Sequence, residues 1–218
     1  MKRLFAVICV FFLGFSAPAW SEVAIGITAN FSELDTDGSE TELSGDLEKT
    51  NASASEDVTV PEVFAEVIAD NGLVIGVSYI PARELGAKSR TDTTPTADDE
   101  TADAGVYSAK AEVENVVLLY TNIPVGPVYA ILGYTRASMK TLESNPTGTT
   151  YGDKDVNGYT YGIGYRGQGL PFVSNGFYKA EVAFTDFDEF SATDSNSDHK
   201  VTASTDVTSV KISVGLQF

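Results

Sequence analysis

Nine charged residues recur at alternate positions of otherwise apolar or small-residue segments, which places them on one face of extended strands. They are Glu62, Glu66, Glu112, Glu114, Glu181, Lys110, Arg166, Lys179 and Lys211. Successive side chains of a strand point to opposite faces, so these charges share an interior with small residues of the same parity. Buried charges are stable only when they are paired, so we predict a mutually neutralising network that plugs a narrow tube. A gated ion path is the functional alternative.

A second chemical candidate is the one histidine, His199, which is flanked by Asp198 and Lys200 and follows Ser195 and Ser197. Nucleophilic catalysis needs a serine that is held against such a base by a rigid scaffold. This segment is rich in small polar residues, which favours a surface histidine. The chain has no Gly-x-Ser-x-Gly elbow, phosphate loop or metal pair. We therefore assign no catalytic residue, no metal site and no cofactor, and expect no enzyme activity; a rim enzyme is the alternative.

Acidic residues dominate the segment 33–57, which holds nine acids and one lysine. Its Glu33–Gly38 part resembles the start of an EF-hand loop, but Glu33 replaces the usual Asp and Ser44 stands where that loop needs a Glu. A second acidic fragment is Asp194–Asp198. A solvated acidic surface is the simpler interpretation, and divalent-cation binding is the alternative. The formal charge of −17 excludes a basic nucleic-acid footprint, so no nucleic-acid partner is expected.

The amino-terminal segment has the pattern of a secretory signal peptide. Met1-Lys2-Arg3 is its positive region, an apolar run follows over Leu4–Phe15, and small residues precede cleavage after Ala19 or Ser21. The apolar run is shorter than the roughly 20 residues that a transmembrane helix needs. We assign residues 1–21 to the signal peptide and 22–218 to one exported domain. The single cysteine, Cys9, lies in the signal, so no disulfide is expected after export.

Eight alternating segments follow, and two kinds of connection join them. The segments lie at about 22–32, 58–69, 73–79, 106–120, 128–139, 157–166, 177–185 and 208–218. The second, fourth and sixth connections are compact turns of Asn, Gly and Pro, whereas long polar loops are expected at 33–57, 84–104, 140–156 and 188–203. This alternation predicts an all-β protein, an eight-stranded antiparallel up-and-down transmembrane β-barrel.

The inward glycines distinguish this barrel from a soluble lipocalin-like one, because an eight-stranded lumen is only wide enough for side chains. Outward aromatic residues near strand ends, such as Tyr79 and Tyr165, fit the girdles at membrane interfaces. Two residues depart from the pattern. Pro61 cannot donate to a ladder and predicts a bulge or strand start, and Asn115 is a polar residue in an apolar row.

With its signal peptide, eight alternating strands and terminal aromatic residue, the chain resembles the small outer-membrane β-barrels of the OmpA/OmpX type without their peptidoglycan-binding domain. The resemblance covers the exported domain. It implies the outer membrane of a Gram-negative bacterium, contact with outer-membrane lipid, and insertion by the barrel-assembly machinery. It further implies an assembly signal in the last strand, at Val210, Ile212, Val214, Leu216 and Phe218.

From the resemblance and the acidic loops together we expect a structural or surface-interaction role, in which those loops bind an extracellular partner. A narrow porin-like channel and a rim enzyme are the alternatives.

Overall fold

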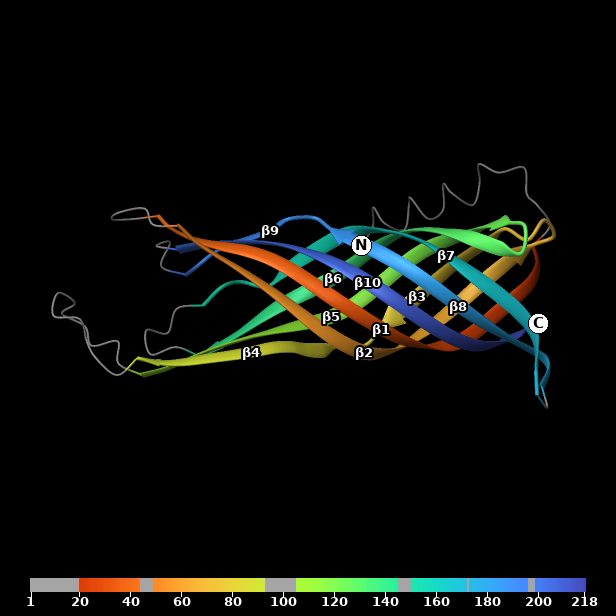
Figure 1. Cartoon of the computed structure of the whole chain (residues 1–218), viewed down its shortest axis with the longest axis horizontal. Helices are drawn as coiled ribbons and strands as arrows, with labels where there is room; N and C mark the ends of the chain where they lie inside the picture. Colours follow the sequence, from red (N-terminus) through yellow and green to blue (C-terminus); the bar gives the residue numbers. More distant parts are fainter. Residues whose placement is uncertain (1–19, 44–48, 93–104, 145–149, 172, 196–198) are drawn as a thin grey trace.

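The computed structural model describes residues 20–43, 49–92, 105–144, 150–171, 173–195 and 199–218, in which antiparallel strands wind around one axis (Figure 1). The strands are β1 (Trp20–Glu42), β2 (Lys49–Ala69), β3 (Val74–Ile80), β4 (Arg83–Asp92), β5 (Gly105–Val125), β6 (Val128–Ser144), β7 (Lys154–Leu170), β8 (Val173–Phe187), β9 (Phe190–Thr193) and β10 (His199–Gln217). Within these ranges, no helix is long and apolar enough to cross a membrane. The predicted signal peptide lies almost entirely outside the described residues and remains a prediction.

The strands close into a ring of eight. The pairing order is β1-β2-β3-β5-β6-β7-β8-β10, and β10 returns to pair with β1. β4 continues the line of β3 past the break at Pro81 and Ala82, since both strands pair with β5. β9 continues the line of β8 along β10 in the same way. The predicted eight-stranded antiparallel up-and-down barrel is therefore confirmed.

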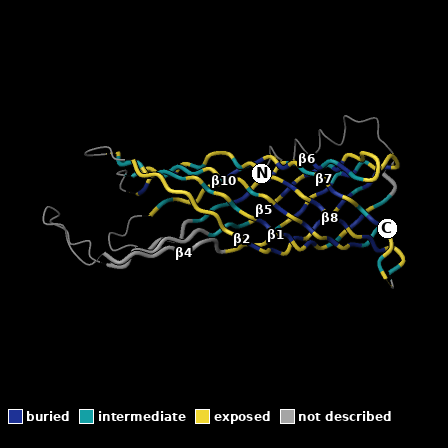
Figure 2. The backbone as a smooth tube through the Cα atoms, in the orientation of Figure 1, coloured by how far each residue is buried: buried dark blue, intermediate teal, exposed yellow. Residues whose placement is uncertain are grey.

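Burial alternates along the strands of the ring (Figure 2). In β1, Ile25 and Ile27 are 50% and 62% exposed, whereas Ala24 and Thr28 are 0% and 5% exposed. The outward apolar side chains form a continuous belt with aromatic residues at both margins. The margin nearer the long strand ends has Phe31, Tyr79, Tyr134, Tyr159 and Phe184; the other has Tyr165, Tyr178 and Phe218. A belt of this extent is the surface of a barrel that faces lipid.

The strands run far past the belt at one end of the barrel only, and we call this part the extension (Figure 1). β1 and β2 stay paired out to Thr41 and Lys49, and β10 follows β1 out to His199. The predicted long loops are therefore largely strand within the described residues. Hydropathy could not reveal these strands on their outer face, because Glu33, Asp35 and Asp37 are exposed to water and have the composition of a polar loop. Backbone pairing still satisfies their hydrogen bonds.

The extension divides into two arms, one formed by β4, β5 and β6 and the other by β2, β1, β10 and β9. β2 pairs with β3 only as far as Val63 opposite Tyr79, and beyond that point β4 pairs with β5 alone. Pro61 lies just past this last pair, where β2 is an edge on its β3 side and a missing N–H is tolerated. Arg83 bridges the gap, because its Nη1 donates to the carbonyl oxygen of Thr59 at 2.6 Å.

Asn115 marks a β-bulge in β5. Its φ of 53° lies in the left-handed region, which Asn tolerates better than branched residues do. The register with β6 shifts between Glu114 and Val117, and Val113 and Val116 both line the interior. One extra residue thus reverses which side chains of the arm face outward.

Four inward aromatic rings each cover a glycine directly opposite on the neighbouring strand. The pairs are Phe64 with Gly26, Tyr120 with Gly76, Tyr129 with Gly164, and Phe177 with Gly215. A Cβ at any of these glycines would lie 2.4–2.5 Å from a ring atom. The rings therefore occupy the space that larger side chains would take, and together they fill the turn-side half of the lumen.

Replacing Gly76 by alanine is expected to lower the free energy of unfolding by about 1–3 kcal/mol, the usual cost of overpacking. The added methyl displaces the ring of Tyr120, whose hydroxyl donates to Glu66 at 2.7 Å. Urea unfolding in detergent micelles measures the loss. Gly152→Ala is the matched control, because its Cβ would meet nothing within 4 Å. A Gly76→Ala barrel as stable as this control would contradict the packing argument.

Candidate functional site

Glu66 lies at the centre of a layer of charges that crosses the lumen. Its carboxylate accepts hydrogen bonds from Lys179 Nζ, Tyr120 Oη and Arg166 Nη1, each at 2.7 Å. The side chain of Glu66 has no exposed surface, and that of Lys179 is 2% exposed. These donors come from β5, β7 and β8, so the carboxylate on β2 ties strands on opposite sides of the ring together.

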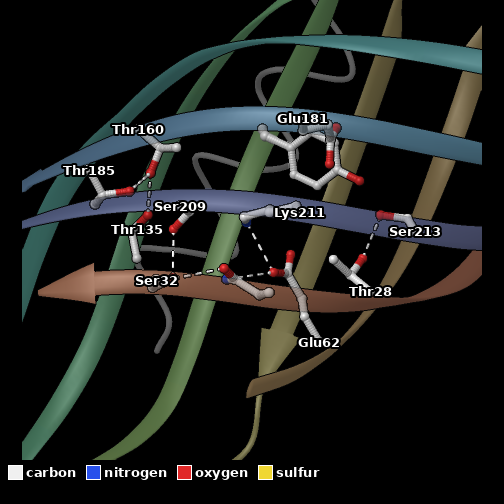
Figure 3. A network of polar contacts seen from close by, with 12 residues as sticks. Thr28, Ser32, Glu62, Thr135, Thr160, Glu181, Thr185, Ser209, Lys211 and Ser213 are labelled. Atoms are coloured by element: carbon white, nitrogen blue, oxygen red, sulfur yellow. Dashed lines mark hydrogen bonds and ion pairs between the residues drawn. The ribbon is translucent and has the colours of Figure 1, made fainter. Parts of the chain in front are cut away.

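A second ion pair lies beside the first. Lys211 Nζ donates to Glu62 Oε2 at 3.0 Å, and the Asn30 amide donates to the same oxygen at 3.3 Å (Figure 3). Glu181 accepts from Tyr129 Oη at 2.7 Å and lies 3.7 Å from Lys179 Nζ. With the Glu66 cluster, these residues make a layer of three acids and three bases.

Aromatic rings complete this charge layer. The Arg166 guanidinium lies 3.7 Å from the ring centre of Phe177, and Lys179 Nζ lies 4.0 Å from that of Phe64. Such cation–π contacts stabilise cations that have left water. The space left between the charged side chains is a cavity of about 20 Å³, about enough for one water molecule. The layer is therefore a filled, internally neutral section of the lumen.

Glu112 and Glu114 do not join this layer, contrary to prediction. The bulge at Asn115 turns them to the outer face of β5, where Glu114 Oε1 accepts from Lys140 Nζ at 2.7 Å. That pair is 22% and 39% exposed, so it is a surface pair. Lys110 precedes them on the same strand, and its side chain lies outside the described part of the structure.

Hydroxyl groups form a further inward set, which the sequence analysis did not single out. Thr160 Oγ1 is hydrogen-bonded to Thr135 at 2.7 Å and to Thr185 at 2.8 Å, and Ser32 Oγ to Ser209 at 2.8 Å (Figure 3). These residues lie on the extension side of the charge layer. Their inward parity and the repetition of Ser and Thr were the available sequence signals.

His199 lies beside an acid. Its Nδ1 lies 3.8 Å from Asp194 Oδ2, and its backbone N–H donates to Asp194 Oδ1 at 3.1 Å. The Ser195 hydroxyl accepts from the backbone N–H of Thr150 at 3.3 Å. Ser197 and Asp198 lie outside the described residues. The absence of enzyme activity remains a prediction.

Carboxylates gather on the outer face just beyond the belt. Asp186, Asp206 and Asp35 lie directly opposite one another on β8, β10 and β1, and we call them the carboxylate row. Glu33 lies opposite Asp57 on the next strand pair. All five are exposed. Like charges in such positions repel each other, so the fold is destabilised by this arrangement. Among the described residues no group of three or more acids, His or Cys has the geometry of a metal site.

One acid of the extension is held differently. Asp155 accepts hydrogen bonds from the Ser138 hydroxyl at 2.7 Å and from the Arg136 guanidinium. These two hydrogen bonds hold the pKa of Asp155 below its ordinary value, and the bond from Ser138 has the larger effect. The ionised carboxylate therefore contributes stability above its ordinary pKa, and this contribution is lost as pH falls through the lowered pKa.

The closed ring, the lipid-facing belt and the filled charge layer define a small transmembrane β-barrel. In architecture it resembles the OmpA/OmpX type, as the sequence predicts. No protein-family model matches this chain. No curated protein matches it.

Several solved structures of membrane barrels are similar to it. Ail of Yersinia pestis is 13% identical, with a TM-score of 0.36, over 88% of this chain and 99% of that one. The outer membrane protease OmpT of Escherichia coli is 10% identical, with a TM-score of 0.46, over 94% and 99%. Neisserial surface protein A is 10% identical, with a TM-score of 0.35, over 87% and 97%. Because each of these TM-scores is below 0.5, the assignment of this chain as a barrel rests on its own strand pairing.

Proposed function

We propose that this protein resides in the outer membrane of a Gram-negative bacterium and acts at the cell surface by binding a cationic partner through its carboxylate row. The tight turns at 70–73 and 126–127 face the periplasm and the extension faces outward, as is usual for such barrels. The observation that carries the proposal is the direct opposition of Asp35, Asp206 and Asp186 across three strands.

The physical reason for this proposal is that the carboxylate row destabilises the folded protein. Opposed carboxylates lower stability by roughly 0.2–1 kcal/mol per pair, and a positively charged partner removes this repulsion. The surroundings add to the field: the described parts of 33–57 carry seven acids and one lysine. Such a surface attracts cations and repels anions over about one Debye length, roughly 8 Å at physiological salt.

Asp206→Asn is expected to raise stability and weaken cation binding together. Removing the central charge relieves two opposed pairs, so the free energy of unfolding rises by about 0.4–2 kcal/mol. Fluorescein-labelled deca-lysine serves as the cationic probe on barrels in nanodiscs, and its apparent Kd is expected to rise. Asp70→Asn, an exposed acid in a turn at the other end, is the matched control. Unchanged binding by Asp206→Asn would refute the carboxylate row as the binding site.

The proposal also holds that the lumen does not conduct. Ions would have to pass the layer in which Glu66 is bonded to Lys179, Arg166 and Tyr120, and breaking such buried pairs is costly. Planar-bilayer recording of the purified barrel is expected to show no discrete conductance steps. Steps that survive dilution of the detergent and disappear after heat denaturation would support the channel alternative instead.

A further inference from the structure

A cavity of about 380 Å³ lies inside the barrel on the extension side of the charge layer. Its wall is mainly apolar and comes from β1 and β2, through Leu34, Val58 and Val60, and from β3, β5 and β7, through Ile80, Leu118 and Val156. Four of these six are buried, with exposures of 8–9% for Val58, Val60, Leu118 and Val156. The interior therefore changes from charged to apolar along the barrel axis.

The floor of this cavity is polar. Ser32, Ser209, Thr135, Thr160 and Thr185 line it with the linked hydroxyls described above, and the Lys211 side chain closes it from below. Hydroxyls both donate and accept hydrogen bonds. The outer end reaches solvent beside Glu56, Arg83 and Asp188, which also line the cavity and are exposed. The site thus has an apolar wall, a hydrogen-bonding floor and an open mouth.

We propose that this cavity binds a neutral, elongated apolar molecule with one hydroxyl end, of the chemical class of medium-chain fatty alcohols. Its volume lies at the lower end of that of ligand pockets. The volume is also roughly 2.5 times the 150 Å³ of an apolar cavity that holds benzene. Scaled from the six carbon atoms of benzene, it has room for a ligand of roughly 15 non-hydrogen atoms. The apolar chain of such a ligand shields the cavity wall from water, while the hydroxyl of the ligand forms hydrogen bonds with the hydroxyl groups of the floor.

The charges around the cavity exclude an anionic head group. Lys211 is already neutralised by Glu62 at 3.0 Å, so a carboxylate on the floor would be an uncompensated buried charge. At the mouth the two acids Glu56 and Asp188 outnumber the one cation Arg83, so the mouth has a net negative charge that repels anions. This site is distinct from the carboxylate row, which lies on the outer face, so either assignment can fail without the other.

A photolabelling experiment separates binding in the cavity from partition into lipid, because adjacent residues of β5 face opposite sides. Leu118 lines the cavity, whereas Val117 and Leu119 are exposed in the belt. The full barrel in phospholipid nanodiscs is irradiated with a diazirine-bearing decanol, and labelled positions are mapped by peptide mass spectrometry. We expect label on Leu118 that excess decanol removes, and label on Val117 and Leu119 that it does not remove. Label confined to the outward residues would overturn the proposal.

A variant that fills the cavity provides the second part of the test. Ala137 is 2% exposed and lines the cavity, so Ala137→Phe is expected to abolish labelling of Leu118 while the belt stays labelled. Ala180→Phe places the same ring on the outer face of β8 and is expected to leave both patterns unchanged. If Ala137→Phe fails the heat-dependent gel shift of a folded barrel, Val58→Phe takes its place. Undiminished labelling of Leu118 in a folded, filled variant contradicts the site.

Competition defines the head group. Unlabelled decanol is expected to remove the Leu118 label at a concentration at least about tenfold lower than decanoate, a difference of about 1.4 kcal/mol. Equal or stronger competition by decanoate would refute the neutral class of ligand.

Discussion

Replacement of Glu66 by glutamine is expected to lower the free energy of unfolding by about 3–5 kcal/mol, the cost of removing one partner from a buried charge cluster. The amide retains the shape of the side chain but leaves Lys179 and Arg166 without their shared counter-charge. It also loses one of the two acceptor oxygens, of which Oε1 accepts from Lys179 and Tyr120 and Oε2 from Arg166, each at 2.7 Å. Urea titration of the barrel in phospholipid vesicles, followed by tyrosine fluorescence, measures the change.

Glu114→Gln is the matched control, because it makes the same chemical change in a half-buried surface pair. Glu114 is bonded to Lys140 at 2.7 Å on the outer face, where ion pairs contribute about 0–1 kcal/mol. A second variant, Glu66→Gln combined with Lys179→Met, is expected to recover part of the loss, since it removes the unpaired cation as well. If Glu66→Gln were no more harmful than Glu114→Gln, the charge layer would not be the stabilising element described above.

Deletion of Phe218 is expected to abolish assembly into the outer membrane while leaving export intact. The backbone N–H and C=O of Phe218 are paired with Val23 at 2.8 and 3.0 Å, and the residue is 66% exposed at the belt margin. Deletion removes both the closing hydrogen bonds and the aromatic anchor of the proposed assembly signal. Fractionation of outer membranes and periplasm, with the heat-dependent gel shift as the test of folding, measures the outcome.

Phe218→Ala separates the predicted assembly signal from closure of the barrel. It keeps the backbone hydrogen bonds to Val23 and removes only the aromatic side chain. We expect this variant to fold from urea into detergent as the parent does, yet to accumulate unassembled in cells. Phe218→Tyr is expected to assemble normally. Normal cellular assembly of Phe218→Ala would show that the ring has no part in the signal.

The belt was predictable from sequence because hydropathy reports it directly. Ile25 and Ile27 face lipid while Gly26 and Thr28 face the lumen, and the alternation leaves one register only. The inward position of Glu62, Glu66 and Lys211 follows from the same parity. Which acid meets which base does not follow, because Glu66 on β2 is bonded to Arg166 on β7, a residue distant in sequence and across the ring.

The extension and the bulge were missed for different reasons. In the extension water contacts the outer face, so acidic residues such as Asp35 look like those of a loop although the strand continues. The alternation of apolar residues continues inward through Leu34, Val58 and Val60. Extending the predicted strands through these three residues would have predicted the apolar cavity. Asn115 was visible as a polar residue in an apolar row, yet a bulge depends on backbone geometry that hydropathy does not report.

The seam between β1 and β10 sets the order of events during biogenesis. Most neighbours in the ring are joined by one connection, but Thr28 and Ser213 across the seam are 185 residues apart. This contact bears the largest loop-closure entropy and cannot form before β10 has been synthesised. Until then the sheet has two open edges, and open edges recruit other chains. A chain in which β1 and β10 have not yet paired is therefore more prone to aggregation than the closed barrel.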